Sequence, residues 1–146
     1  MAEVTKDELR TAILNSGGRL YAVGFDLTGI DLSLVKWLSG ASLSEANLSG
    51  ADLSLTNLSG ANLSGADLSG ANLSGADLTG AVLIRADLSG VDLTRANLSG
   101  ANLSGACLSE ADLIGVDLTG ANLAGVDLTG VDLTGVDLSG AKGGPF

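Results

Sequence analysis

Residues Ala41 to Gly140 consist of twenty consecutive five-residue repeats, of which Ala66-Asp67-Leu68-Ser69-Gly70 is typical. Leucine occupies the centre of every repeat, from Leu43 to Leu138. We call this central residue i and number the other positions from it. Position i−2 is alanine in fourteen repeats and valine in five, and position i−1 is mostly Asp or Asn. This regularity decides the fold, and the rest of the chain is interpreted from it.

The five-residue period indicates a short strand piece followed by a corner. Positions i−2, i−1 and i alternate apolar, polar, apolar, which is the period of a β-strand. Positions i+1 and i+2 are mostly Ser or Thr and then Gly, which are residues typical of turns. An α-helix does not fit, because a step of five residues turns by about 140° and would spread the leucines around the helix.

The array of A-[D/N]-L-x-x repeats resembles the pentapeptide-repeat family, in particular its bacterial and cyanobacterial members. The resemblance covers residues 25–140, because 25–29 and 30–34 are rougher copies of the motif. It implies an all-β solenoid, a right-handed quadrilateral β-helix in which four repeats form one square coil and positions i and i−2 point inward. The organisation that we predict is a capping helix and connector at 1–24, the β-helix at 25–140, and a C-terminal tail at 141–146.

The N-terminal segment carries the signals of a short α-helix. Thr5-Lys6-Asp7-Glu8 matches a capping box, in which the Thr side chain and the Glu side chain satisfy backbone N–H groups at the start of a helix. Gly17-Gly18 provides a stop. The sequence therefore predicts a helix from Lys6 to Asn15 that caps the first coil.

One residue too many lies between Ser33 and Gly40, so the repeat register shifts there. Either Trp37 is the central residue, or Leu38 is central and the extra residue precedes it. We favour Trp37, because a central Leu38 would turn the charged side chain of Lys36 inward. Tyr21, Phe25 and Trp37 gather in this part of the chain, and we predict that these aromatic side chains form a structural cap.

Composition limits the classes of function. The net charge of −10 and the isoelectric point near 4.1 argue against direct nucleic-acid binding, because phosphate would be repelled. The charged N-terminus is unlike a secretory signal, and a polar residue interrupts every repeat, so we expect a cytoplasmic protein without a membrane span. Cys107 is the single cysteine and the chain has no histidine to activate it, so we predict no enzyme activity, no cofactor and no metal site.

The outward positions define the candidate interaction surface. Residues twenty apart should stack, so the i−1 residues form four columns, of which the one from Ser42 to Asn122 holds no acid. The regular Asp residues fit hydrogen bonding at the corners, and they also fit partner binding. Leu55, Ile114, Arg95 and Glu110 are further outward departures from the motif that would mark a partner footprint. The candidate residues are Asp67, Asp87, Asp92, Asp112, Asp117, Asp127, Asp132, Asp137, Val82, Ile84 and Arg85.

We therefore predict a non-enzymatic structural or protein-interaction module with an unidentified protein partner. An uncapped C-terminal coil would leave backbone groups unpaired, which also predicts a homodimer through that end. The family resemblance implies an alternative function, because some members are acidic rods that imitate duplex DNA and bind or inhibit DNA gyrase, a topoisomerase. This chain differs from those members in having no loop insertion between its repeats.

Overall fold

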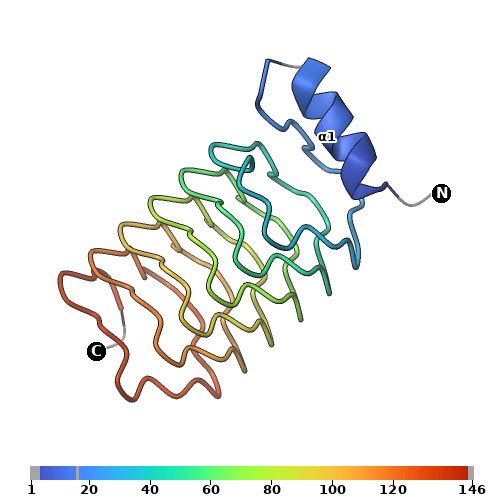
Figure 1. Ribbon diagram of the computed structural model, residues 1–146. Helices are drawn as coiled ribbons and strands as arrows, with labels where there is room; N and C mark the ends of the chain where they lie inside the picture. The colour runs from blue at the N-terminus through green and yellow to red at the C-terminus, as the bar shows by residue number, and fades with distance from the viewer. Residues whose placement is uncertain (1–3, 16, 145–146) are drawn as a thin grey trace.

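Parallel pairing between residues twenty apart stacks the repeats into coils. Bridges join Asn47 to Asp67, Asp67 to Asp87 and Val82 to Asn102, and the same pairing recurs along the array. The computed structural model describes residues 4–15 and 17–144, and it is a rod of stacked coils with helix α1 (Lys6–Asn15) at one end (Figure 1). The fold is the predicted right-handed quadrilateral β-helix. Strand pairing in the described residues consists of these single-residue bridges.

Each repeat of the inner coils pairs its backbone with the coils on both sides and then turns a corner. The Leu68 N–H donates to the Asp87 carbonyl at 2.7 Å, and the Asp87 N–H donates to the Ala66 carbonyl at 2.9 Å. At the corner, the Ala71 N–H donates to the Leu68 carbonyl at 3.0 Å, while Gly70 has a φ of 63°. This hydrogen bond and the left-handed third residue are features of a type II turn, which explains the glycine at i+2.

The interior of the rod is filled by the leucine at i and the small residue at i−2. Leu68 and Ala66 are both 0% exposed, and the same positions are buried in successive coils as far as Leu123. Thr56 replaces alanine at one i−2 position, and its hydroxyl donates to the Leu53 carbonyl at 2.6 Å, so the polar atom is satisfied. Each fully buried leucine stabilises the fold by roughly 1.5–3 kcal/mol before chain entropy is counted.

Helix α1 closes the N-terminal end of the rod. The predicted capping box is present, with the Glu8 N–H donating to Thr5 Oγ1 and the Thr5 N–H donating to Glu8 Oε2 at 2.7 Å. The Thr5 N–H and then the Thr5 hydroxyl donate to the Glu8 carboxylate, and these two hydrogen bonds lower the pKa of Glu8. Leu9 is buried in the core, and the Lys6 ammonium donates to the Ser33 carbonyl at 3.0 Å. The Lys6 ammonium also lies 3.9 Å from Asp31 Oδ1, so both apolar and polar contacts attach the helix to the first coil.

The β-helix begins five residues earlier than the sequence predicts. Tyr21 pairs with Ser42, so residues 20–24 form the first repeat. Leu20 takes position i−2 and Ala22 takes position i, and both are buried. The large and small inward residues are thus exchanged in this repeat. A search for a central leucine misses it, although the interior receives the same pair of side chains.

The preferred placement of the extra residue is wrong, because Leu38 and not Trp37 is the central residue. Leu38 is 0% exposed, and Val35 at i−2 is also buried. Lys36 and Trp37 both lie between these inward residues, with Lys36 exposed and Trp37 half-buried against the core. Since the strand piece bulges outward by one residue, Lys36 does not turn inward, and the cost that argued against this register does not arise.

The predicted aromatic cap does not fill the end of the core. Tyr21 and Phe25 are 58% and 50% exposed, and Trp37 covers the core from outside the coil. The aliphatic side chains of Leu9 and Leu20 occupy the buried positions at this end instead.

The opposite end of the rod is open. Pairing extends past Gly140, because Asn122 pairs with Lys142, while residues 145–146 of the predicted tail lie outside the described residues. No described residue covers the inward side chains of the last coil, which are only partly buried. The prediction that two copies associate through this end stays a prediction. The partly buried residues are Val126, Leu128, Val131, Leu133, Val136, Leu138 and Ala141.

Truncating a leucine should cost more in the middle of the rod than at its open end. Leu73→Ala removes a fully buried side chain and should lower the free energy of unfolding by about 2–5 kcal/mol. Leu133→Ala removes a side chain that is already partly in water, so we expect roughly half that loss. Urea denaturation of both variants measures the difference, and equal losses would show that the last coil is as well covered as the middle.

Candidate interaction surface

The i−1 side chains make the same local contact whether they are Asp or Asn. Asp67 Oδ1 accepts hydrogen bonds from the Ser69 N–H at 2.9 Å and the Ser69 hydroxyl at 2.6 Å. Asn72 Oδ1 accepts the equivalent pair from Ser74 at 3.0 and 2.7 Å. This bond to a residue two positions ahead supports the corner. Since the neutral amide performs this task equally well, the corner does not require the negative charge of aspartate.

The predicted aspartates lie on three sides of the rod, in the register expected from the sequence. Bridges stack Asp67 on Asp87, Asp92 on Asp112, and Asp117 on Asp137. Residues 41–140 hold twelve acidic and two basic residues, so they carry the whole net charge of −10. Like charges in such close register repel each other, and this repulsion lowers stability. Asp87, Asp112, Asp127, Asp132 and Asp137 are exposed, and Asp67, Asp92 and Asp117 are half-buried.

Hydrogen bonds at the C-terminal corners hold several carboxylates in the ionised form. The side chain and then the backbone N–H of Thr129 lower the pKa of Asp127. Thr134 lowers the pKa of Asp132 by the same two contacts, and Ser139 lowers that of Asp137. Each shift makes the ionised aspartate more stable in the folded than in the unfolded chain.

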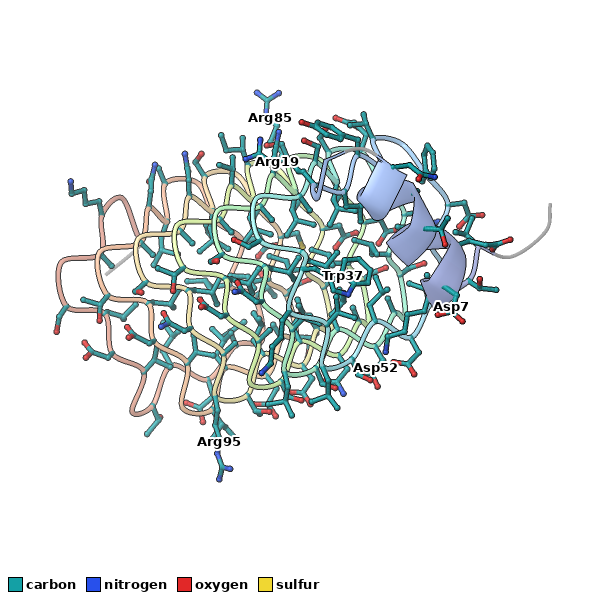
Figure 2. All side chains as sticks on the ribbon, turned by 45° about the horizontal axis from the view of Figure 1, so that its top comes forward. Asp7, Arg19, Trp37, Asp52, Arg85 and Arg95 are labelled. Carbon is teal, nitrogen blue, oxygen red and sulfur yellow. The ribbon has the colours of Figure 1, made fainter. Side chains whose placement is uncertain are left out.

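Val82, Ile84 and Arg85 form a smaller exposed patch than predicted. They follow one another at one corner of the acid-free side, but Val82 and Ile84 are half-buried and only Arg85 is exposed. Arg85 and Arg95 point away from the rod on opposite sides (Figure 2). The structure therefore does not bring these two cations into one footprint.

A second group of outward residues does come together, on the side of the rod that carries Arg95. Leu55 and Ile114 are 59% and 68% exposed, and they lie with Arg95 around an open hollow of about 570 Å³. Ser74, Gly75 and Thr94 contribute to its lining. We call this site, defined by these six residues, the Arg95 hollow. Leu55 lies at one end of the hollow and Ile114 at the other, and Arg95 supplies one positive charge between them.

Six exposed residues occupy corner positions where the fold otherwise uses glycine. All six have a φ between 56° and 61°, in the left-handed region. The Leu55 side chain extends over Gly75 in the following coil. A Cβ added at Gly75 would lie 2.6 Å from Leu55 Cδ2, so the glycine there leaves room for the leucine side chain. Sequence reasoning noted most of these departures but could not see their backbone strain. The six corner residues are Leu34, Glu45, Leu55, Arg85, Arg95 and Glu110.

Cys107 and the acidic side chains are the remaining candidate features. Cys107 is half-buried, with its Sγ 3.2 Å from Ser109 Oγ and 3.9 Å from Asp127 Oδ2. Over residues 4–15 and 17–144, no three Asp, Glu, Cys or His side chains are grouped so that they could hold a metal ion. The described part of the chain also contains no helix that is both long and apolar enough to cross a membrane.

Comparison with known proteins identifies the repeat. The family model for pentapeptide repeats matches residues 38–75, 71–109 and 106–142. The solved structure of Rfr23, a pentapeptide repeat protein from the cyanobacterium Cyanothece 51142, is 32% identical, with a TM-score of 0.66 over 90% of this chain and 95% of that one. The pentapeptide repeat protein alr5209 from Nostoc Pcc 7120 is 31% identical, with a TM-score of 0.55 over 97% and 99%. A search of curated proteins finds no significant match.

The lowered pKa values predict a loss of stability in acid. Because the folded-state pKa values of Asp127, Asp132 and Asp137 lie below the ordinary value of 3.8, their stabilisation is complete above that pH and disappears as the pH falls through the folded values. A variant with Asn at all three positions keeps the corner acceptors but not the titration. Its melting temperature should therefore fall less than that of the wild type between about pH 4 and pH 2. Parallel curves for the two proteins would contradict this account.

Proposed function

The chain belongs to the pentapeptide-repeat family, and we propose that it is a non-enzymatic module that binds another protein through the outer surface of its rod. The observation that carries this proposal is the set of six corner residues in the left-handed conformation. A residue other than glycine pays about 1–2 kcal/mol for this conformation. The side chains are exposed, so burial in the core does not offset that cost.

Strain retained at exposed positions is typical of functional sites, where contacts with a partner compensate for it. The rod also holds the backbone of its outward residues in place, because the repeats of the inner coils are hydrogen-bonded to the coils on both sides. A rigid surface loses little conformational entropy on binding, which favours affinity from a modest set of contacts. The cytoplasmic location predicted from the sequence stays a prediction.

Replacing the six corner residues with glycine should separate function from stability. We expect the variant to unfold at higher urea concentration, with a gain of roughly 0.5–1 kcal/mol per residue after the larger entropy loss of glycine is counted. We also expect it to lose partners that the wild type captures from a native lysate, as measured by quantitative mass spectrometry. A matched control carries six Ser→Thr changes at position i+1, where both residues occur naturally: Ser49, Ser59, Ser69, Ser89, Ser99 and Ser104. Unchanged capture by the glycine variant would contradict the proposal.

A second candidate function is imitation of duplex DNA at the DNA-binding surface of gyrase or another topoisomerase. The observation that favours it is charge density. Five coils at about 4.8 Å each place the net charge of residues 41–140 along roughly 24 Å, or one charge per ~2.4 Å. Duplex DNA carries one per ~1.7 Å. The aspartates supply this charge beyond what the corners need, since asparagine makes the same hydrogen bonds.

A DNA supercoiling assay with gyrase tests this second candidate. Inhibition should weaken as salt is raised, and it should disappear when the eight candidate aspartates are changed to Asn, because the corners persist without the charge. The six-glycine variant serves as the control, since it keeps all eight aspartates and should still inhibit. Full supercoiling activity in a large molar excess of the wild-type protein would exclude DNA mimicry of gyrase substrates.

A further inference from the structure

The Arg95 hollow differs from the rest of the surface in its charge. Arg95 is one of only two basic residues between 41 and 140, and it forms no ion pair within the described part of the chain. The nearest acid along the chain, Asp92, already accepts from the Thr94 N–H at 2.9 Å and the Thr94 hydroxyl at 2.7 Å. The guanidinium is held outward at a strained corner, with a φ of 57°. The cation is therefore presented to solvent and is available to a carboxylate of another molecule.

The aliphatic residues on either side of the hollow are also unpartnered. Leu55 leans over Gly75 in the next coil, where any Cβ would collide with its Cδ2 atom. Ile114 stands two coils beyond Gly75, at 68% exposure. Ser74 and Thr94 lie between them. The backbone N–H and the hydroxyl of Ser74 both donate to Asn72 Oδ1, and those of Thr94 both donate to Asp92 Oδ1. The hollow thus offers two apolar side chains and one cation to a partner. The hydroxyl and backbone N–H groups of Ser74 and Thr94 are already hydrogen-bonded within their own repeats.

Extended polypeptide fits the dimensions of this site. Leu55 and Ile114 belong to coils that are three layers apart, or about 14 Å at ~4.8 Å per coil. An extended segment advances about 3.3 Å per residue, so five residues span this distance, and residues one, three and five face the same side. A segment with aliphatic residues at its ends and an acid between them would place all three side chains against the hollow.

We propose that the Arg95 hollow binds an extended segment of a partner protein that presents a carboxylate between two aliphatic side chains. This inference rests on the proposed function, which it deepens by naming the chemistry of the partner. Local charge complementarity supports it, because a bond between guanidinium and carboxylate is charge-assisted and can be bidentate. Asp52, Asp92 and Asp112 accept hydrogen bonds from the lining residues Ser54, Thr94 and Ile114, so they repel a partner carboxylate at short range, and the bond to Arg95 has to exceed this repulsion.

Methyl NMR of isoleucine gives a direct test. The chain has four isoleucines, with Ile114 in the hollow and Ile84 beside Arg85 on the other side of the rod. The probe is a capped pentapeptide with leucine at positions one and five, glutamate at position three, and serine between. Titrating it into the labelled wild-type protein should shift the Ile114 methyl resonance and leave that of Ile84 in place. A matched peptide with glutamine at position three should bind about tenfold more weakly, which corresponds to about 1.4 kcal/mol.

Variants assign the contacts. Arg95→Gln should remove the preference for glutamate over glutamine, Arg95→Lys should retain part of it, and Arg85→Gln should leave it unchanged. Leu55→Gly relieves a strained corner, so it should fold well and weaken both peptides equally. Absence of an Ile114 shift, equal affinity for the two peptides, or equal shifts at Ile84 and Ile114 would each overturn the proposal.

The outcome is distinguishable from failure of the proposed function. If the peptide does not bind but the six-glycine variant still loses its captured partners, the module binds through other corner residues and the assignment of the hollow is wrong. If the peptide binds with the predicted preference, the hollow is a peptide site whichever corner residues govern capture from the lysate.

Discussion

The structure depends on one constraint, which is that the strand pieces of the inner coils must hydrogen-bond to the coils about twenty residues away on both sides. In the repeat around Leu68, the N–H and carbonyl groups near positions i−2 to i pair with neighbours above or below. A closed coil of this size leaves space inside for only two side chains per repeat, which accounts for leucine at i and a small residue at i−2. It also forces a left-handed residue at each corner, which accounts for the glycines at i+2. The sequence period is thus the direct result of the pairing.

The same constraint explains which parts of the fold could be predicted. The inward direction of i and i−2 follows from alternation alone, whereas the four-sided coil came from family resemblance, since no period in the sequence counts the sides. The repeat at 20–24 was missed because Leu20 and Ala22 exchange the usual positions while filling the interior in the same way. The sequence argument against a central Leu38 is that Lys36 would then occupy the inward position i−2, and Val35 occupies that position instead. A bulge between two buried positions lets Lys36 and Trp37 both remain outside.

The candidate surface was predictable in register but not in grouping. The columns of aspartate follow from stacking every twenty residues, and the bridges confirm them. Whether Arg85 and Arg95 share a face depends on the number of sides, and Figure 2 shows them on opposite sides. The strain at the six corner residues could not be seen in the sequence, because a departure from glycine has no visible cost until its φ is known. The only sign of this strain in the sequence is the replacement of glycine at i+2, and neutral sequence change would produce the same replacement.

The two ends of the rod are chemically different, and this limits how it can assemble. Helix α1 covers the first coil and buries its own Leu9 against it. That end of the rod therefore has no open coil on which another could stack. The last coil keeps its valines and leucines partly exposed, and within the described residues no bridge joins Asp112 to Asp132 there. Head-to-tail stacking into a filament would need both ends to be open. The homodimer predicted through the C-terminal coil is the end-to-end association that fits this difference between the two ends, because two such coils joined to each other form a closed pair.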